Sequence, residues 1–221
     1  MPRTRRAVRT VAAAGLLLAL ATIAVLLLMS EEPPVERPDE PEYQEGVPTS
    51  CSDCHANLPQ NLSQPVLDFN ASVHYTEFVT CVDCHGGDPT ATSLIDAMSP
   101  DRGYIGIPDK VTLNAQCSGC HSIQGAEYRS GVHEEALRQG NLSSASCADC
   151  HGVHRILPVE DANSTVHPLR EPSTCGTCHP GAASEYGEGV HWRRVQDDLQ
   201  GATCIDCHRS HDILPKEDAA S

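Results

Sequence analysis

Cysteine and histidine are the residues whose types and spacing could do chemistry in this sequence. All 12 cysteines fall in the pattern Cys-x-x-Cys-His, which occurs six times in 221 residues. Two thiols and an imidazole so close together could bind a metal ion, form a redox pair or a disulfide, or hold a prosthetic group covalently. The six strings are Cys51, Cys54 and His55; Cys81, Cys84 and His85; Cys117, Cys120 and His121; Cys147, Cys150 and His151; Cys175, Cys178 and His179; and Cys204, Cys207 and His208.

The repetition of the string decides among these chemistries. A structural zinc site combines two Cys-x-x-Cys pairs and needs no histidine after each of them. A thioredoxin-like redox pair is typical of one motif in a βαβ context, and ordinary disulfides do not need the histidine either. Cys-x-x-Cys-His is the attachment signature of haem c, in which the cysteines bind the porphyrin and the histidine binds iron. The sequence therefore predicts six haem c groups with their irons.

The remaining histidines match the predicted irons in number. Six of the 12 histidines lie outside the strings, and each iron needs a second axial ligand. We therefore expect bis-histidine ligation throughout. Met98 is the one methionine beyond the N-terminal segment, and we expect it to pack rather than to bind iron. The predicted second ligands are His74, His133, His154, His167, His191 and His211.

Spacing also limits which iron each of these histidines can bind. His211 follows His208 by three residues, so on a helical turn both imidazoles lie on one side of the backbone. They could not bind opposite faces of one porphyrin, and His154 stands in the same relation to His151. We therefore expect the second ligand of each iron to come from a segment that holds another haem.

An internal repeat groups the strings into two-haem modules. The stretch from Cys117 aligns with the stretch from Cys175, at an offset of 58 residues that later becomes 57. Both stretches contain Glu-Tyr, Gly-Val-His and Ile-Leu-Pro. Residues 51–85 resemble a diverged first copy that lacks a histidine three positions after His85, a loss that His167 would make up. The modules are placed at about residues 51–85, 117–158 and 175–215.

The segments that must position these groups predict little regular structure. Residues 86–116 are rich in Gly, Pro, Asp and Ser and indicate a loop along haem edges. Short helices are expected at residues 126–138 and 182–199, with few strands anywhere. Two Phe and one Trp are too few for an aromatic core, so porphyrins must supply the apolar interior. The expected fold class is a mostly irregular, haem-organised chain with short α-helices, plus one N-terminal transmembrane helix.

The first 48 residues differ from the rest. Residues 1–10 hold four arginines, and residues 11–30 are uncharged over a length that can cross a bilayer. The positive-inside rule then puts the following residues outside the cytoplasm. We expect residues 1–30 to be an uncleaved anchor, with a cleaved signal peptide as the alternative. Residues 31–48 form an acidic, proline-rich linker, and residues 49–221 form the hexahaem domain.

The quoted motifs carry a resemblance. The six strings, with the segments EYRSGVHEEALRQG, CADCHGVHRILP and VHPLREPSTCGTCHPG, resemble multihaem c-type cytochromes of anaerobic respiratory chains over residues 51–215. Two groups are similar: membrane-anchored quinol-oxidising cytochromes of the NapC/NirT type, and extracellular cytochromes that pass electrons outward, some of which polymerise. The resemblance implies electron transfer as the function. Its implied partners are redox proteins, membrane quinol and further copies of the chain.

The expected function is that of an electron carrier and not an enzyme. Electrons would pass through six closely stacked haems outside the cytoplasmic membrane, in a domain anchored in the periplasm or at the cell surface, or secreted as an extracellular filament. A net charge of −15 excludes nucleic acid as a partner and suits basic redox proteins. The alternatives are a quinol dehydrogenase subunit, and a nitrite- or hydroxylamine-type oxidoreductase with one open iron. The matched histidine count disfavours the open iron.

Overall fold

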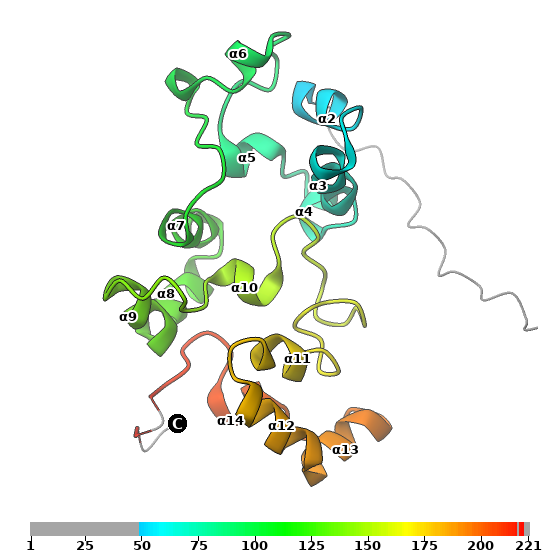
Figure 1. Cartoon of the computed structure of the whole chain (residues 1–221), viewed down its shortest axis with the longest axis vertical. Coiled ribbons are helices and arrows are strands. Elements are labelled where there is room, and N and C mark those ends of the chain that lie inside the picture. The colour runs from blue at the N-terminus through cyan, green and yellow to red at the C-terminus, as the bar shows by residue number, and fades with distance from the viewer. Residues whose placement is uncertain (1–48, 216, 219–221) are drawn as a thin grey trace, which may run out of the picture. The chain divides into compact units, whose positions relative to one another are not determined.

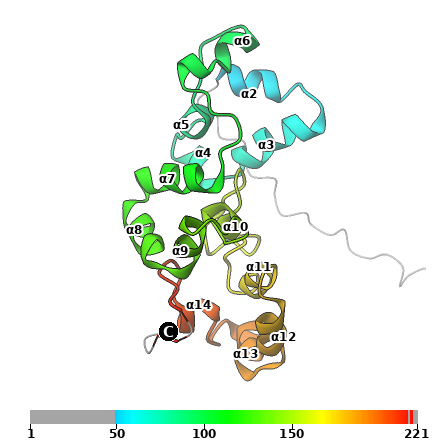
Figure 2. The ribbon, with the colours of Figure 1, turned by 60° about the vertical axis from the view of Figure 1, so that its left-hand side comes forward.

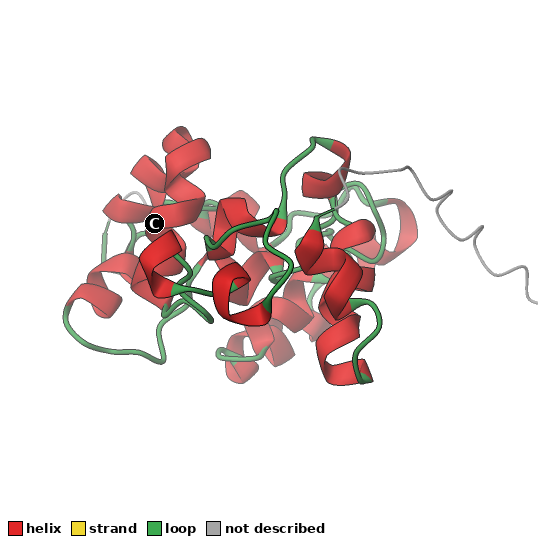
Figure 3. Ribbon diagram, turned by 90° about the horizontal axis from the view of Figure 1, so that it is seen from above, coloured by secondary structure: helices red, strands yellow, loops and turns green. Residues whose placement is uncertain are grey.

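Short helices joined by loops make up this computed structural model. It describes residues 49–215 and 217–218, which belong to one compact unit, Tyr43–Ser221. No strand occurs among the described residues (Figures 1 and 3), and this confirms the expectation of short helices in a mostly irregular chain. The helices are α2 (Ser50–His55), α3 (Gln60–Asn70), α4 (Val73–Thr76), α5 (Cys81–His85), α6 (Leu94–Ala97), α7 (Lys110–Cys120), α8 (Ser122–Ser130), α9 (Val132–Arg138), α10 (Cys147–His151), α11 (Glu171–Gly176), α12 (Pro180–Glu188), α13 (Val190–Asp198) and α14 (Cys204–His208), with the 3-10 turn η1 (Pro100–Arg102).

The predicted transmembrane helix at residues 11–30 and the linker at residues 31–48 lie outside the described residues. Among residues 49–215 and 217–218, no helix combines the length and the apolar character that a bilayer crossing requires. The anchor therefore stays a prediction from the sequence.

Four of the attachment strings form a helix of five or six residues that begins with a capping box. These are α2, α5, α10 and α14. In α10, the Asp149 carboxylate accepts hydrogen bonds from the Ser146 N–H (2.7 Å) and the Ser146 hydroxyl (2.6 Å). Such a cap partners backbone groups that the first turn leaves free. A helix this short can therefore hold both cysteines and the histidine of one string.

Helices α5, α10 and α14 end at the histidine of their string because the next residue leaves the helical conformation. Gly86, Gly152 and Arg209 follow these helices with φ of 66°, 77° and 68°. Glycine adopts such an angle without strain, whereas arginine does not. The expectation that a histidine three residues later continues on the same helical turn is therefore wrong, although the segment still leads it away from its own string.

The helices predicted at residues 126–138 and 182–199 are each found as two. Helices α8 and α9 meet at Gly131, and α12 and α13 meet at Gly189. Both glycines have extended backbone, with ψ of 163°. A Cβ atom at Gly131 would lie 2.9 Å from the carbonyl oxygen of His211. At Gly189 only atoms of Tyr186 and Glu185 lie within 4 Å of such a Cβ, so the shared break follows from the repeated glycine, and the distant segment merely packs against it at Gly131.

The loop predicted at residues 86–116 is wrong in its last part and near its middle. Helix α6 and turn η1 fall within it, and α7 begins at Lys110 and continues through the third string. Asp109 starts α7, because its side chain accepts a hydrogen bond from the Thr112 N–H at 2.8 Å. A single capping residue thus outweighed the loop-like composition around it. Helix α3, which contains Pro65, was not predicted either.

The described residues bury very little apolar surface of their own. Tyr128, Leu137 and Val195 are the buried apolar side chains among them, while 17 large apolar side chains are exposed. A domain of this size normally buries one contiguous apolar cluster. Something other than the polypeptide must therefore cover these side chains, as the sequence predicts for porphyrins.

Consecutive modules are joined by a repeated backbone contact. The Val73 N–H donates to the Ile156 carbonyl at 2.9 Å, and the Val132 N–H donates to the Ile213 carbonyl at 2.8 Å. Each isoleucine opens an Ile-Leu-Pro segment, and each valine precedes a predicted iron ligand. In Figures 1 and 2 the red segment after α14 runs beside α9. Each Ile-Leu-Pro segment thus docks on the module before it.

Candidate functional site

Eight histidines face each other in four pairs. In every pair one histidine belongs to an attachment string and the other is a predicted second ligand, and the ring centroids are 6.0 to 6.3 Å apart. Two imidazoles that bind one metal ion from opposite sides, each at about 2 Å, have their ring centroids about 6 Å apart. The pairs are His121 with His74, His85 with His154, His179 with His133, and His151 with His211.

These pairs fit an iron that is held by a porphyrin. Among the described residues, no three His, Cys, Asp or Glu side chains converge as a metal site. Each centre therefore offers two protein ligands, whereas structural zinc takes four. Haem iron needs only two axial ligands from the protein. The cysteines are all free of disulfide bonds, so they remain for attachment.

Every pair joins two different modules. The histidine of a Val-His sequence faces the first string of the next module, as in His74 with His121 and His133 with His179. The histidine just before Ile-Leu-Pro faces the second string of the preceding module. The spacing of the histidines in the sequence had predicted that each second ligand comes from a segment that holds another haem. Iron ligation by these residues stays a prediction.

Hydrogen bonds fix the tautomer of two of the string histidines. The Nδ1 atom of His85 lies 2.8 Å from the Gly106 carbonyl, and Nδ1 of His55 lies 3.3 Å from the Leu62 carbonyl. A carbonyl oxygen can only accept, so Nδ1 must carry the proton in both rings. Nε2 then keeps the lone pair with which an imidazole can bind a metal ion.

The facing rings also favour the neutral imidazole. In each pair one histidine has a lowered pKa, caused first by burial and then by the opposite ring; these are His74, His133, His151 and His154. Burial and a nearby like charge both disfavour protonation. Neutral imidazole is the form that binds metals, so the lowered pKa of these four histidines favours the form that a metal ion requires.

Within each module, the first cysteines of the two strings are neighbours. A hydrogen bond between the Cys117 and Cys147 thiols lowers the pKa of Cys117 to about 7 and raises that of Cys147. The two thioether bonds would therefore form next to each other. The equivalent pairs are Cys51 with Cys81 and Cys175 with Cys204.

Strings of successive modules are neighbours as well. Burial, followed by the charge of Cys117, raises the pKa of Cys84. Burial, followed by the charge of Cys175, raises the pKa of Cys150 to about 11. Neighbouring thiols thus link the six strings into one series that follows their order along the chain.

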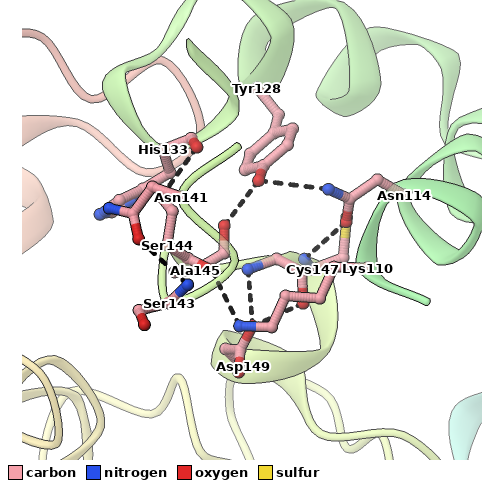
Figure 4. Close-up of polar contacts among 11 residues, drawn as sticks. Lys110, Asn114, Tyr128, His133, Asn141, Ser143, Ser144, Ala145, Cys147 and Asp149 are labelled. Carbon is pink, nitrogen blue, oxygen red and sulfur yellow. Dashed lines mark hydrogen bonds and ion pairs between the residues drawn. The ribbon is translucent and has the colours of Figure 1, made fainter. Parts of the chain in front are cut away.

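Polar contacts couple the two strings of the second module (Figure 4). The Asn114 side chain accepts from the Cys147 N–H at 3.0 Å and donates to the Tyr128 hydroxyl at 3.2 Å. That hydroxyl donates to the Ala145 carbonyl at 2.6 Å. Lys110 lies 2.9 Å from the Asp149 carboxylate, which caps α10. The helix of the third string thereby sets the position of the fourth.

The third module repeats part of this coupling with different residues. Glu171 takes the place of the asparagine and accepts from the Ile205 N–H at 2.8 Å. The Tyr186 hydroxyl donates to the Ala202 carbonyl at 2.9 Å. Sequence reasoning noticed the repeated Glu-Tyr only as a landmark of the repeat. The Glu-Tyr pair recurs at the same position of both repeats. This recurrence could have indicated that the tyrosine positions the strings.

Four predicted iron ligands make no ring contact with another histidine within residues 49–215. Two of them, His55 and His208, belong to strings. His167 is 6% exposed, and its Nδ1 accepts a hydrogen bond from the Leu169 N–H at 3.1 Å. His191 is exposed at the start of α13. For these four histidines the structure brings no opposite imidazole into place, and their ligand role stays a prediction.

The chain is distantly similar to multihaem c-type cytochromes. It is 26% identical over 162 residues to a probable tetrahaem c-type cytochrome of Nitrosomonas europaea, which covers 69% of this chain and 64% of that protein. It is 22% identical over 156 residues to the c-type polyhaem cytochrome OmcC of Geobacter sulfurreducens, which covers 59% of this chain and 20% of that protein.

The chain thus matches less than two thirds of the length of either relative. No family model and no solved structure matches it. Both relatives are described as cytochromes, and neither description names an enzymatic reaction. The cysteine spacing and these relatives agree on c-type haem as the cofactor.

Proposed function

We propose that this protein is a six-haem c-type cytochrome that carries electrons along a row of bis-histidine haems. The four histidine pairs carry the proposal, because each offers two imidazoles at the separation that one iron between them requires. When bound, haem supplies reversible one-electron chemistry at iron. The two distant cytochrome relatives support the same class.

The residues of the chain contribute attachment, ligation and order. The capped helices of the first, second, fourth and sixth strings would each present two thiols for thioether bonds. Each of the four imidazole pairs would hold one haem iron from both sides, which would leave no position for a substrate on those four irons. The neighbouring cysteines keep consecutive attachment sites together from the first string to the sixth. A row of closed centres suits electron transfer and does not suit catalysis at iron.

The second ligands also favour low reduction potentials. Imidazole in place of an axial methionine lowers the potential of haem iron. The Glu127 carboxylate lies 3.2 Å from Nδ1 of His211. A carboxylate at this nitrogen makes the imidazole a stronger donor, so the haem that binds His211 should have the lower potential of two otherwise equal centres.

Location and partners are part of the proposal and rest on the sequence. Residues 1–30 would anchor the domain at the outer face of the cytoplasmic membrane, and the net charge of −15 would attract basic redox proteins.

Membrane fractionation tests the anchor. The full chain should sediment with membranes, and a chain in which a cleavable export signal replaces residues 1–30 should be released in soluble form. Equal distribution of the two would contradict it.

His55 and His208 favour a second candidate, because neither faces another histidine within residues 49–215. An iron on either one could remain open and bind a small molecule, as in a multihaem oxidoreductase. One spectrum separates the two candidates, since an open iron is high-spin and a bis-histidine iron is low-spin.

Haem counting and spin state test the proposal together. We expect the mass of the purified, exported protein to show six bound haems, and its oxidised EPR spectrum to be entirely low-spin. The double variant Cys81→Ala/Cys84→Ala is the control and should lose one haem. Fewer than six haems in the unaltered protein, or a high-spin signal that responds to added nitrite or cyanide, would contradict the electron-carrier proposal.

A further inference from the structure

Each module carries an acidic residue at one fixed place. It stands six residues before the histidine of the Val-His sequence, and it is Asp68 in the first module, Glu127 in the second and Glu185 in the third. An aromatic residue follows it directly in all three modules. The repeat thus fixes where each module places this carboxylate.

The docking of the Ile-Leu-Pro segments brings a histidine to two of these carboxylates. The valine five residues after the acidic residue donates its N–H to the isoleucine carbonyl of such a segment, at 2.9 Å in the first module and 2.8 Å in the second. Two residues before that isoleucine stands a histidine, His154 in one segment and His211 in the other. Docking in the same register therefore brings His154 toward Asp68 and His211 toward Glu127.

The second module shows the contact directly. Oε2 of Glu127 lies 3.2 Å from Nδ1 of His211. An ionised carboxylate can only accept a hydrogen bond, so Nδ1 carries the proton and Nε2 keeps its lone pair. The ring of His211 faces that of His151, with 6.2 Å between the centroids. The carboxylate thus contacts the nitrogen of the ring that a shared iron would not use.

The first module brings the same charge to the equivalent ring. Burial and the His85 ring lower the pKa of His154, and the Asp68 carboxylate opposes this lowering. Asp68 accepts a hydrogen bond from the Gln64 side chain at 2.9 Å, and a neutral amide leaves its negative charge in place. Asp68 is half-buried, so salt screens its charge less than that of an exposed group. Both histidines that precede Ile-Leu-Pro therefore have a carboxylate beside them.

The two facing histidines of the Val-His sequences have no carboxylate of this kind. Burial and the His121 ring lower the pKa of His74, and no carboxylate acts on it. The Asp149 charge opposes the lowered pKa of His133, but that carboxylate caps α10 and lies 2.9 Å from the Lys110 ammonium, which offsets its charge. The two kinds of second ligand therefore differ in the charge beside them.

We propose that Asp68 and Glu127 are positioning residues that lower the reduction potentials of the irons bound by His154 and His211. A carboxylate beside an imidazole makes it a stronger donor and adds negative charge, and both effects stabilise ferric iron. In the order of the strings, the second and fourth irons then have low potentials, and the third and fifth have higher ones. An electron in this part of the row therefore rests first on the third or fifth iron. This inference rests on the proposed haem ligation.

The third module supplies a matched control. Glu185 has the same place in the repeat and is exposed. The two Ile-Leu-Pro segments dock on the first and second modules, so neither of their histidines comes to Glu185. A substitution there removes one negative charge without changing the charge beside His154 or His211.

Redox titration of the haem-loaded full chain in detergent tests the proposal, with each low-spin signal followed by EPR. Glu127→Gln keeps an acceptor oxygen and loses the charge. At a given potential, one iron should shift about tenfold toward the ferrous form, which is about 59 mV for a one-electron couple. Asp68→Asn should shift a different iron, and the double variant should shift both. Glu127→Asp keeps the charge and should shift less, while Glu185→Gln should shift none.

Three results would overturn the proposal. Equal shifts in Glu127→Gln and Glu185→Gln would mean that net charge, and not the contact with histidine, sets the potential. A shift spread evenly over all irons would mean the same. A high-spin iron in Glu127→Gln would mean that the carboxylate serves ligation itself. Six haems with an entirely low-spin spectrum and no shifted iron contradict this inference alone, whereas a haem count below six contradicts the proposed function first.

Discussion

The second and third modules share most of their landmarks, yet they differ in how far neighbouring segments enclose them. Gly131 and Val132 are covered by the segment after α14, whereas Gly189 and Val190 are not. His133 accordingly faces His179, while the equivalent His191 faces no histidine in the described residues. Similar sequences therefore produce the same local structure in both modules, and the adjoining module decides whether a given histidine meets a partner.

The hydrogen bonds inside the two modules are more alike than the contacts that neighbouring segments make with them. Each has a tyrosine hydroxyl that donates to a carbonyl before the second string, and an acceptor side chain at the start of that string's helix. Tyr128 is buried, whereas Tyr186 is only half-buried. Tyr128 is more buried and also accepts a bond from Asn114, so paired substitutions can measure what enclosure and that additional bond contribute together.

The largest effect is expected from removing the histidine that is enclosed. His133→Ala should lower the unfolding free energy of the haem-loaded protein by about 4 kcal/mol, because a ligand that ties two modules together is lost. One iron should also become high-spin. His191→Ala should change the unfolding free energy by less than about 0.5 kcal/mol, because this side chain is exposed and faces no histidine in the described residues. Thermal unfolding followed by circular dichroism measures both, and equal losses would contradict the comparison.

The second-largest difference between the two modules is expected when a methyl group is added at Gly131 or at Gly189. At Gly131 a Cβ would lie 2.9 Å from the carbonyl oxygen of His211, in another module, and Gly131→Ala should cost about 2 kcal/mol. At Gly189 the nearest atom is the Tyr186 carbonyl oxygen at 3.0 Å. That carbonyl belongs to the adjoining helix, whose end can shift, so Gly189→Ala should cost less than about 1 kcal/mol. Chemical denaturation in dilute solution compares them, and a larger loss at Gly189 would show the opposite order.

The two tyrosines offer a milder test of burial. Tyr128→Phe leaves the Asn114 amide and the Ala145 carbonyl without their partner in a buried place, and we expect a loss of about 2 kcal/mol. Tyr186→Phe removes one bond to the Ala202 carbonyl in a more exposed place and should cost about 1 kcal/mol. Unfolding free energies from denaturant titration measure the difference. Identical losses would mean that enclosure of the second module adds nothing to this bond.

The smallest expected effect is a gain in stability. Arg209 has a φ of 68°, where the second module has Gly152 with 77°. Arg209→Gly should raise the unfolding free energy by about 1 kcal/mol, because glycine adopts this conformation without strain. Arg209→Ala is the control, since it also removes the ion pair with Asp212 but keeps a Cβ atom. The melting temperature should rise in the glycine variant only. A rise in both variants would mean that the loss of the ion pair, and not the removal of the Cβ atom, causes the gain.

Several local features of the fold have causes within a few residues, although they were not predicted from the sequence. The helices of the strings are short because a cap and a left-handed residue lie within a few positions of the cysteines, as Ser146 and Gly152 do around α10. The breaks at Gly131 and Gly189 were not predicted, because residues 126–138 and 182–199 each suggested one helix. The same break occurs at both glycines, although a distant segment, near His211, packs only against Gly131, so its cause is local. The start of α7 was missed although its signal, Asp109 before Thr112, is local.

By itself, the sequence determined the attachment chemistry and the repeat, since thiols and imidazoles a few residues apart on one turn need no distant partner. It also supplied the candidates for second ligands by counting. Only the tertiary structure decided which imidazoles face one another, because the members of each pair are 46 to 69 residues apart. No local rule relates residues at such separations. Their meeting depends on how one module docks on the next, through backbone contacts such as that between Val132 and Ile213.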